Sequence, residues 1–150
     1  PYMLAAMVAV DEGISPETVD EAMLAFGMPM GPIELADTVG LDIALAAGKT
    51  LAGAAQVPAC LLARVDKGQL GKKSGQGFYS WTDGKAKKSA AGAVPDGLAG
   101  RLIKPLIERV EQLVVDGVVA DGELADAGVI FGTGFAPFTG GPLNFHRLNN

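Results

Sequence analysis

The sequence predicts an all-α fold built from two related helical subdomains. Two observations predict it. Apolar residues recur at helical spacing between Pro/Gly breaks along most of the chain, and the same order of motifs occurs twice. The 150 residues, of which 49% are apolar, are enough for one domain or for two small subdomains that share a core.

The first predicted helix, residues 1–12, is apolar on every face from Tyr2 to Val10. Pro1 suits a first helical turn, and Gly13 suits a helix stop. A helix at the surface would carry a polar stripe, so this helix should be buried on most sides. In a chain of this size, we expect part of that burial to come from another domain or subunit.

The second predicted helix begins at Ser15 and Pro16, which suit the N-cap and the first helical position, and it ends at Gly27. Asp20 and Glu21 are expected to face solvent. The inward face is formed by the apolar residues at helical spacing: Val19, Ala22, Met23 and Phe26.

The stretch Phe26–Asp37 is the most constrained part of the first half of the chain. Pro29 and Pro32 fix their own φ and push the preceding residues out of the helical region, and Gly31 permits a close backbone approach. A weaker version of the same stretch recurs at residues 131–142.

Further helices are predicted at residues 32–39, 41–51, 58–68, 98–115, 121–130 and 140–148. Residues 70–81 form a basic glycine-rich loop that runs into a short aromatic strand or turn, and residues 82–97 form a polar linker with Asp-Gly turn signals. The helix at 98–115 should turn six side chains inward: Leu102, Leu106, Arg109 (by its stem), Val110, Leu113 and Val114.

The repeated order of motifs suggests a duplication. In each copy an acid-Gly-aliphatic sequence ends a long helix, an aspartate (Asp20 or Asp126) follows in a short helix, and Phe-Gly leads to Gly-Pro. The later parts need a gap of a few residues. We therefore predict a first helical repeat at residues 1–81, a linker at 82–97 and a second repeat at 98–150, packed like two halves of a dimer.

Composition narrows the function classes. Cys60 is the only cysteine, which excludes an internal disulfide and favours a reducing, cytoplasmic setting. No stretch is long and apolar enough for a membrane span, and the first residues do not resemble a signal peptide. The chain begins at Pro1 in the middle of a helical pattern, so we expect a piece of a larger protein.

Charge is unevenly distributed. The net charge is −5, but basic residues outnumber acids between Arg64 and Lys104. The acidic remainder argues against nucleic acid as the main partner. The basic segment suits either a small phosphorylated ligand or a solvated linker.

Candidate catalytic residues are scarce. His146 is the only histidine, and its place beside Arg147 suits a surface role better than general-base catalysis. Cys60 lies on an apolar helix face and suits the core better than nucleophilic chemistry. Glu34 and Asp37 flank the Gly-Pro turn, either as helix-terminal or interdomain contacts or as solvated acids.

The glycine-rich sequence at residues 71–77 does not match the spacing of a P-loop or of a dinucleotide-binding fingerprint, although a positive loop near a pyrophosphate stays open. From the residues alone, the chain is an apolar helical domain with a rigid Pro/Gly loop and without a catalytic set. That combination indicates a binding or assembly module.

Three blocks of sequence, at residues 1–13, 19–42 and 71–79, resemble the C-terminal domain of the NAD-dependent 3-hydroxyacyl-CoA dehydrogenases in order and spacing. The second copy, with Gly134–Pro142, resembles the extra repeat of the multifunctional fatty-acid β-oxidation α subunit. Ala136 and the segment at 82–97 depart from the family pattern.

The resemblance implies a duplicated helical domain of the 6-phosphogluconate dehydrogenase C-terminal type. It implies that NAD binds to an upstream Rossmann domain that also carries a catalytic His–Glu pair, and that a substrate-holding asparagine precedes Pro1. The chain itself would then contain no catalytic residue and no cofactor site, and would be inactive alone. Its partners would be that NAD-binding domain, the acyl-CoA substrate, and a thiolase subunit or a second copy.

Met30, Pro32 and Leu35 are the candidate substrate-binding residues, because the stiff loop presents them as apolar groups suited to an acyl chain. The alternative is that they only pack the two repeats together. Lys72 and Lys73 either face cofactor or CoA phosphates or have a structural role in the loop. Two other functions stay open: an assembly or dimerisation module without ligand contact, and a dehydrogenase for another 3-hydroxy acid.

Overall fold

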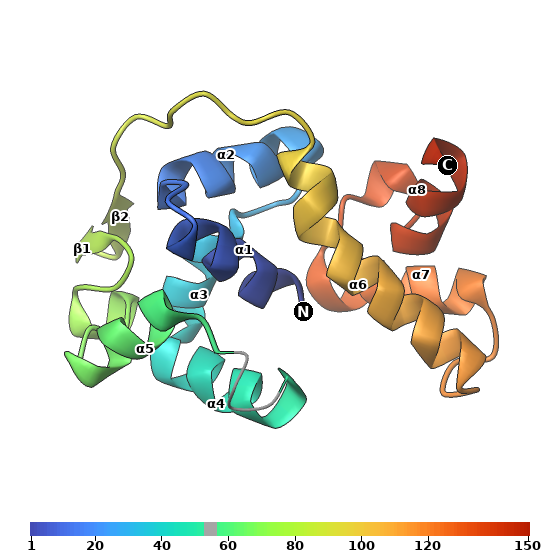
Figure 1. Cartoon of the computed structure of the whole chain (residues 1–150), viewed down its shortest axis with the longest axis horizontal. Helices are drawn as coiled ribbons and strands as arrows, with labels where there is room; N and C mark the ends of the chain where they lie inside the picture. Colours follow the sequence, from blue (N-terminus) through green and yellow to red (C-terminus); the bar gives the residue numbers. More distant parts are fainter. Residues whose placement is uncertain (53–56) are drawn as a thin grey trace.

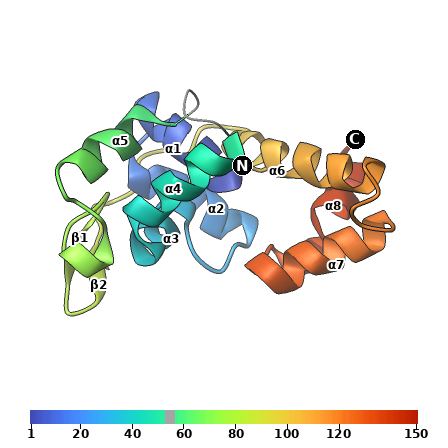
Figure 2. The same cartoon turned by 90° about the horizontal axis from the view of Figure 1, so that it is seen from below.

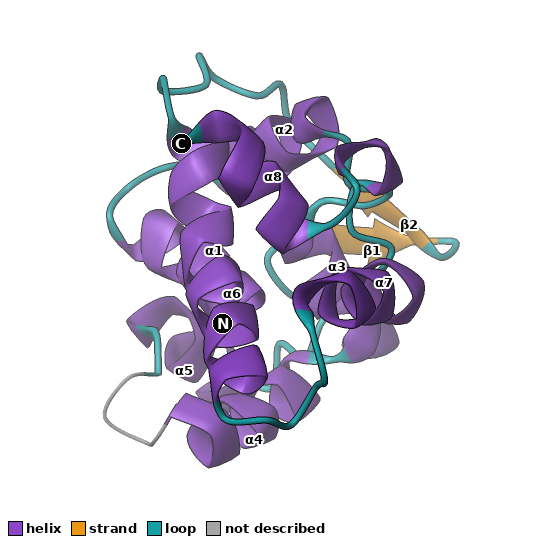
Figure 3. Cartoon of the chain, turned by 90° about the vertical axis from the view of Figure 1, so that its right-hand side faces the viewer, coloured by secondary structure: helices purple, strands orange, loops and turns teal. Residues whose placement is uncertain are grey.

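The computed structural model describes residues 1–52 and 57–150. The helices, in chain order, are α1 (Tyr2–Asp11), α2 (Pro16–Phe26), α3 (Pro32–Val39), α4 (Leu41–Ala52), α5 (Ala59–Asp66), the 3-10 turn η2 (Lys72–Ser74), α6 (Leu98–Val115), α7 (Gly122–Thr133), the 3-10 turn η3 (Pro137–Thr139) and α8 (Pro142–Asn149). Two short strands, β1 (Ser80–Thr82) and β2 (Lys85–Lys87), form an antiparallel hairpin at one edge (Figure 3). The all-α prediction is confirmed apart from this hairpin.

The helix α1 lies at the centre of the molecule. It packs against α2, α3 and α5 of the first half and against α6 of the second half (Figure 1). Ala6, Met7 and Ala9 are fully buried, whereas Val8 keeps 42% of its surface exposed. Helices of the same chain therefore cover one face of α1, whereas the remaining apolar residues of the helix are half-buried or exposed.

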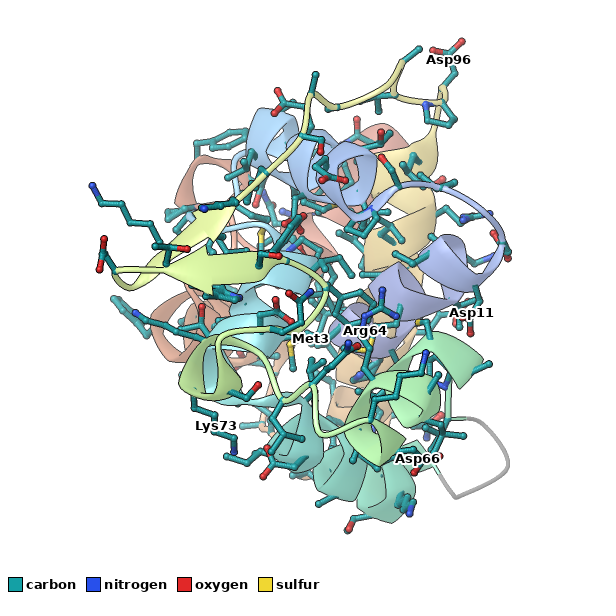
Figure 4. All side chains as sticks on the ribbon, turned by 90° about the vertical axis from the view of Figure 1, so that its left-hand side faces the viewer. Met3, Asp11, Arg64, Asp66, Lys73 and Asp96 are labelled. Carbon is teal, nitrogen blue, oxygen red and sulfur yellow. The ribbon has the colours of Figure 1, made fainter. Side chains whose placement is uncertain are left out.

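The helix ends follow local signals. The Ser15 hydroxyl accepts a hydrogen bond from the Thr18 N–H and caps α2, and the Asp121 carboxylate caps α7 in the same way through Leu124. Asp11 reaches further along the chain, because its carboxylate accepts the N–H groups of Ala59 and Cys60 and so caps α5, beside which it lies in Figure 4.

The second half is shorter than the first. Helices α6, α7 and α8 follow the order of α1, α2 and α3, and α6 runs from the first half into the second (Figures 1 and 2). The predicted face of α6 is incomplete: Ile103 and Ile107 are buried along with Leu102 and Val110, whereas Arg109 is exposed. These isoleucines are buried because α6 packs on α8 as well as on α1 and α2.

The predicted linker, residues 82–97, begins with regular structure. Asp83 and Gly84 adopt positive φ and form the tight turn of the hairpin, which makes Lys85–Lys87 a strand. The rest of the segment arches over α2 to reach α6 (Figure 1). None of the described helices is long and apolar enough to cross a membrane.

Candidate functional site

The loop between α2 and α3 is fixed at its start by the end of α2. Gly27 and Met28 both donate their N–H groups to the Met23 carbonyl, at 3.2 and 3.0 Å. The Met28 side chain is then buried at 8% exposure. The chain needs only Pro29, Met30 and Gly31 to reach the first residue of α3.

The Asp20 side chain fixes the other end of this loop. Its carboxylate accepts the N–H groups of Ile33 at 2.7 Å and Glu34 at 3.1 Å, the first free donors of α3. A negative charge at a helix N-terminus also interacts favourably with the helix dipole. Gly31 permits this contact, because a Cβ at that position would overlap the Asp20 carboxylate.

The expectation that Asp20 faces solvent is wrong, because the residue is 1% exposed. The Tyr79 hydroxyl donates to its carboxylate at 2.7 Å, and the Lys88 ammonium lies 3.5 Å away. Burial raises the pKa of Asp20, although these hydrogen bonds and the Lys88 charge oppose the shift. Burial and the charge of Asp20 also raise the pKa of the Tyr79 hydroxyl.

Lys88 joins Asp20 to Glu34. Its ammonium donates to the Glu34 carboxylate at 2.5 Å. Burial lowers the pKa of Lys88, but the hydrogen bond to Glu34 and the charge of Asp20 outweigh that effect, so its pKa is raised. Of the predicted alternatives for Glu34, the structure therefore shows a paired acid rather than a freely solvated one.

Asp37 is fully buried, so the alternative of a solvated acid is wrong for this residue. Its carboxylate accepts the N–H groups of Phe78 and Tyr79 and the indole N–H of Trp81, each at 2.9 Å. The glycines Gly71 and Gly77 lie so close to Asp37 that a Cβ on either would overlap it.

The glycine-rich loop therefore folds around a carboxylate of its own chain. Asp37 already uses the N–H groups of Phe78 and Tyr79, so these two donors are not available to cradle an anion. Lys73, which Figure 4 labels, forms an exposed ion pair with Asp42 at 2.6 Å, and the Lys72 ammonium lies 5.7 Å from the Trp81 ring. Lys73 therefore pairs with the first turn of α4, and Lys72 lies beside a ring of the same loop region.

The predicted substrate-binding residues differ in burial. Met30 and Leu35 are half-buried, and each keeps part of its side chain accessible. Pro32 is fully buried at the first position of α3. Of these residues, only Met30 and Leu35 offer a side-chain surface to a ligand in this chain.

The second Pro/Gly stretch, residues 131–142, packs against the first. The Phe138 ring lies on Gly27, where a Cβ would overlap it, and Gly134 lies beside Pro29. The Phe26 ring stands edge-on to Phe135, with ring centroids 5.8 Å apart. The two stretches thus brace each other at the junction between the halves.

Asp126 repeats the capping arrangement of Asp20. Its carboxylate accepts the N–H groups of Leu143 at 2.7 Å and Asn144 at 2.9 Å, the first free donors of α8. Gly141 again lies where a Cβ would overlap the aspartate. The sequence carries a signal for this, since an aspartate stands 11 residues before the glycine of Gly-Pro in the first copy and 15 residues before it in the second.

Comparison with known proteins identifies the family. The model of the 3-hydroxyacyl-CoA dehydrogenase C-terminal domain matches residues 1–81, more than half of the chain. The chain belongs to this family. The predicted resemblance is confirmed.

Relatives of this C-terminal domain are much longer proteins. The chain is 36% identical to the fatty acid oxidation complex subunit alpha of Shewanella sp. (strain MR-4), covering 96% of the chain and 23% of that protein. The corresponding subunit from Shewanella oneidensis is 34% identical with the same coverage. The chain thus spans less than a quarter of the curated relatives that it matches.

A solved structure confirms the fold of this C-terminal domain. The chain superposes with a TM-score of 0.74 on 3-hydroxybutyryl-CoA dehydrogenase from Escherichia coli K12, over 100% of this chain and 51% of that one. The two are 20% identical, so the likeness concerns the fold alone. It covers both halves of the chain.

The remaining candidate residues of this C-terminal domain lie away from the loop. His146 is exposed on α8, where its ring contacts Asn150. The Cys60 thiol lies 3.4 Å from the Met7 carbonyl. Burial, together with a hydrogen bond to the Asp11 carboxylate, raises the pKa of the Cys60 thiol to about 12. Within residues 1–52 and 57–150, no cluster of His, Cys, Asp and Glu side chains could hold a metal ion.

Proposed function

We propose that this chain is the substrate-binding and domain-closing part of an NAD-dependent 3-hydroxyacyl-CoA dehydrogenase of fatty-acid β-oxidation. The whole protein would oxidise 3-hydroxyacyl-CoA to 3-oxoacyl-CoA. NAD and the acid–base pair would lie on a domain outside residues 1–150. Family membership and the names of the Shewanella relatives support this proposal.

The observation that carries the proposal is the fixed loop between α2 and α3. The polar groups beneath it already have partners: Asp20 binds the start of α3 and Tyr79, and Asp37 binds the glycine-rich loop. The loop and the start of α3 therefore offer an apolar surface at Met30 and Leu35, which are partly accessible. Such a surface suits a hydrocarbon chain, whose binding depends on apolar area and not on directional bonds.

A first experiment tests whether the chain belongs to such an enzyme. The isolated chain and the full-length protein are each assayed for NADH formation from NAD and 3-hydroxyacyl-CoA. We expect turnover by the full-length protein and none by the isolated chain. Turnover by the isolated chain, or inactivity of a folded full-length protein, would overturn the proposal.

A second experiment tests ligand contact. In the full-length protein, Met30→Ala and Leu35→Ala should lower kcat/KM for long acyl chains by about 10-fold relative to short ones, because each removes apolar contact worth about 1–3 kcal/mol. Ile43→Ala, which truncates an exposed apolar side chain on α4, serves as the control. A change in oligomer mass without a change in chain-length preference would favour an assembly module instead.

A further inference from the structure

A groove of about 850 Å³ lies between α7 and α8. Its floor includes Asp126, and its walls carry acidic, apolar and basic groups at separate places. The lining includes Glu123, Asp126, Phe131, Asn144 and Arg147.

The corresponding groove of the first half lies between α2 and α3. The capping aspartates align the two, because Glu17 and Glu123 each stand three residues before their aspartate. Gly31 and Gly141 contact these two aspartates. Glu34 and Asn144 each stand three residues after their glycine, and Asp37 and Arg147 each stand six residues after it. Four lining positions of the second groove thus have counterparts in the first.

The first groove is filled by residues 78–92 of the same chain. The Tyr79 hydroxyl donates to Asp20 at 2.7 Å, and Lys88 reaches Glu34. The Ser89 N–H donates to the Glu17 carboxylate at 3.1 Å. The N–H groups of Phe78 and Tyr79 donate to Asp37. All four counterpart positions are engaged by this one segment, which contains the β1–β2 hairpin.

The second groove is open. Among the described residues, the Asp126 carboxylate accepts hydrogen bonds from the backbone N–H groups of Leu143 and Asn144 only, and no group takes the place of the Tyr79 hydroxyl. At the rim, Glu123 is exposed and the Phe131 side chain is 90% exposed. An exposed phenylalanine, Phe131, beside the buried carboxylate of Asp126 indicates a surface that a partner would cover.

We propose that this groove docks a tyrosine-bearing segment of the longer polypeptide, from outside residues 1–150, as residues 78–92 fill the first groove. The tyrosine hydroxyl would donate to Asp126, and apolar side chains beside it would cover Phe131. Arg147 stands at the position of the second groove that corresponds to Asp37 in the first. The docked segment would therefore present a carbonyl or carboxylate acceptor to Arg147 instead of N–H donors.

The longer polypeptide is the source that the structure favours. The first groove is filled from within its own chain, and the Shewanella relatives provide more than three quarters of their length outside the matched part. Docking of such a segment goes beyond the proposed function. It rests on one part of that function, namely that residues 1–150 belong to a longer polypeptide. A dehydrogenase assay tests the chemistry, and the experiment below tests the groove, so the two can fail separately.

The test places the photoreactive p-benzoylphenylalanine at position 131 of the full-length protein. Phe138, which is 78% exposed but lies on Gly27 and outside the groove, provides the matched control. Both substitutions keep an aromatic ring at an exposed position, so the fold should persist. After illumination, the cross-linked peptides are identified by mass spectrometry.

We expect the position-131 probe to give an intramolecular cross-link to a segment outside residues 1–150 that contains a tyrosine, and the position-138 probe to give no such product. Changing that tyrosine to phenylalanine should reduce the yield at least several-fold. A cross-link to a second copy or to another protein would overturn the proposal. So would the absence of a cross-link to such a segment in a folded, illuminated protein.

Discussion

Asp20 and Asp126 perform the same local task in different surroundings. Each accepts two backbone N–H groups at the start of a helix, and each lies against a glycine that leaves room for it. Asp20 is also covered by Tyr79 and Lys88, whereas the groove over Asp126 is open. The comparison teaches that a cap is set by nearby sequence, while its burial depends on segments far along the chain.

The largest expected effect separates the two aspartates. Asp20→Ala should lower the free energy of unfolding by about 3–5 kcal/mol. The substitution leaves two backbone N–H groups and the Tyr79 hydroxyl without their acceptor, and it removes one partner of the partly buried Lys88 ammonium. Asp126→Ala should cost about 1–2 kcal/mol, the range for loss of a helix cap. Urea unfolding of the two variants measures the difference. Equal losses of unfolding free energy in the two variants would contradict the proposed difference between Asp20 and Asp126.

A smaller effect isolates the cover over Asp20. Tyr79→Phe removes the hydroxyl that donates to the carboxylate and should lower the free energy of unfolding by about 1–3 kcal/mol. Tyr2→Phe is the matched control, since its buried hydroxyl has no partner among the described residues. That control should be neutral or stabilising. A loss at position 2 as large as the loss at position 79 would argue against a specific role for the Tyr79 bond.

The smallest effect is a pH dependence. The pKa of Asp20 is raised above its ordinary value of 3.8, so the native state holds this proton more tightly than the unfolded state. Its contribution to stability is then fully present below the unfolded pKa and is lost as pH rises through the folded pKa. Relative to Asp20→Asn, the parent protein should gain stability as pH falls from neutral toward 4, by at most about 1.4 kcal/mol per pH unit.

Urea unfolding of the parent and of Asp20→Asn at several pH values measures that difference. The asparagine variant has no titrating group at this position. Subtracting its free energy of unfolding from that of the parent protein at each pH therefore removes the contributions of the other titrating groups. A difference in stability that stays constant with pH, or that falls as pH is lowered, would contradict a raised pKa for Asp20.

The helix ends could be predicted because their signals are local. Ser15 with Pro16, Gly27 and Gly40 bound α2 and α3, and the Asp-Gly signal at position 83 marks a turn, although the strand after it was not expected. The repeated order of motifs also points to the aspartate and the Gly-Pro that recur at the starts of α3 and α8.

Burial of the polar residues could not be predicted in the same way. Asp20 sits on the polar side of the α2 pattern, and nothing near it in sequence reveals Tyr79, 59 residues away. Asp37 depends on a loop more than 40 residues further along. The inward face of α6 was incomplete for the same reason, because Ile103 and Ile107 are covered partly by α8 from the end of the chain.

The connection between the two halves carries a consequence for limited proteolysis. The Ser89 and Gly92 N–H groups are held by Glu17 and Thr18 of α2, and Leu98 is buried at the start of α6. Residues 93–97 between these anchors are exposed. A protease should therefore cut there first, and the two pieces should stay together without a covalent link, because α6 remains packed on α1.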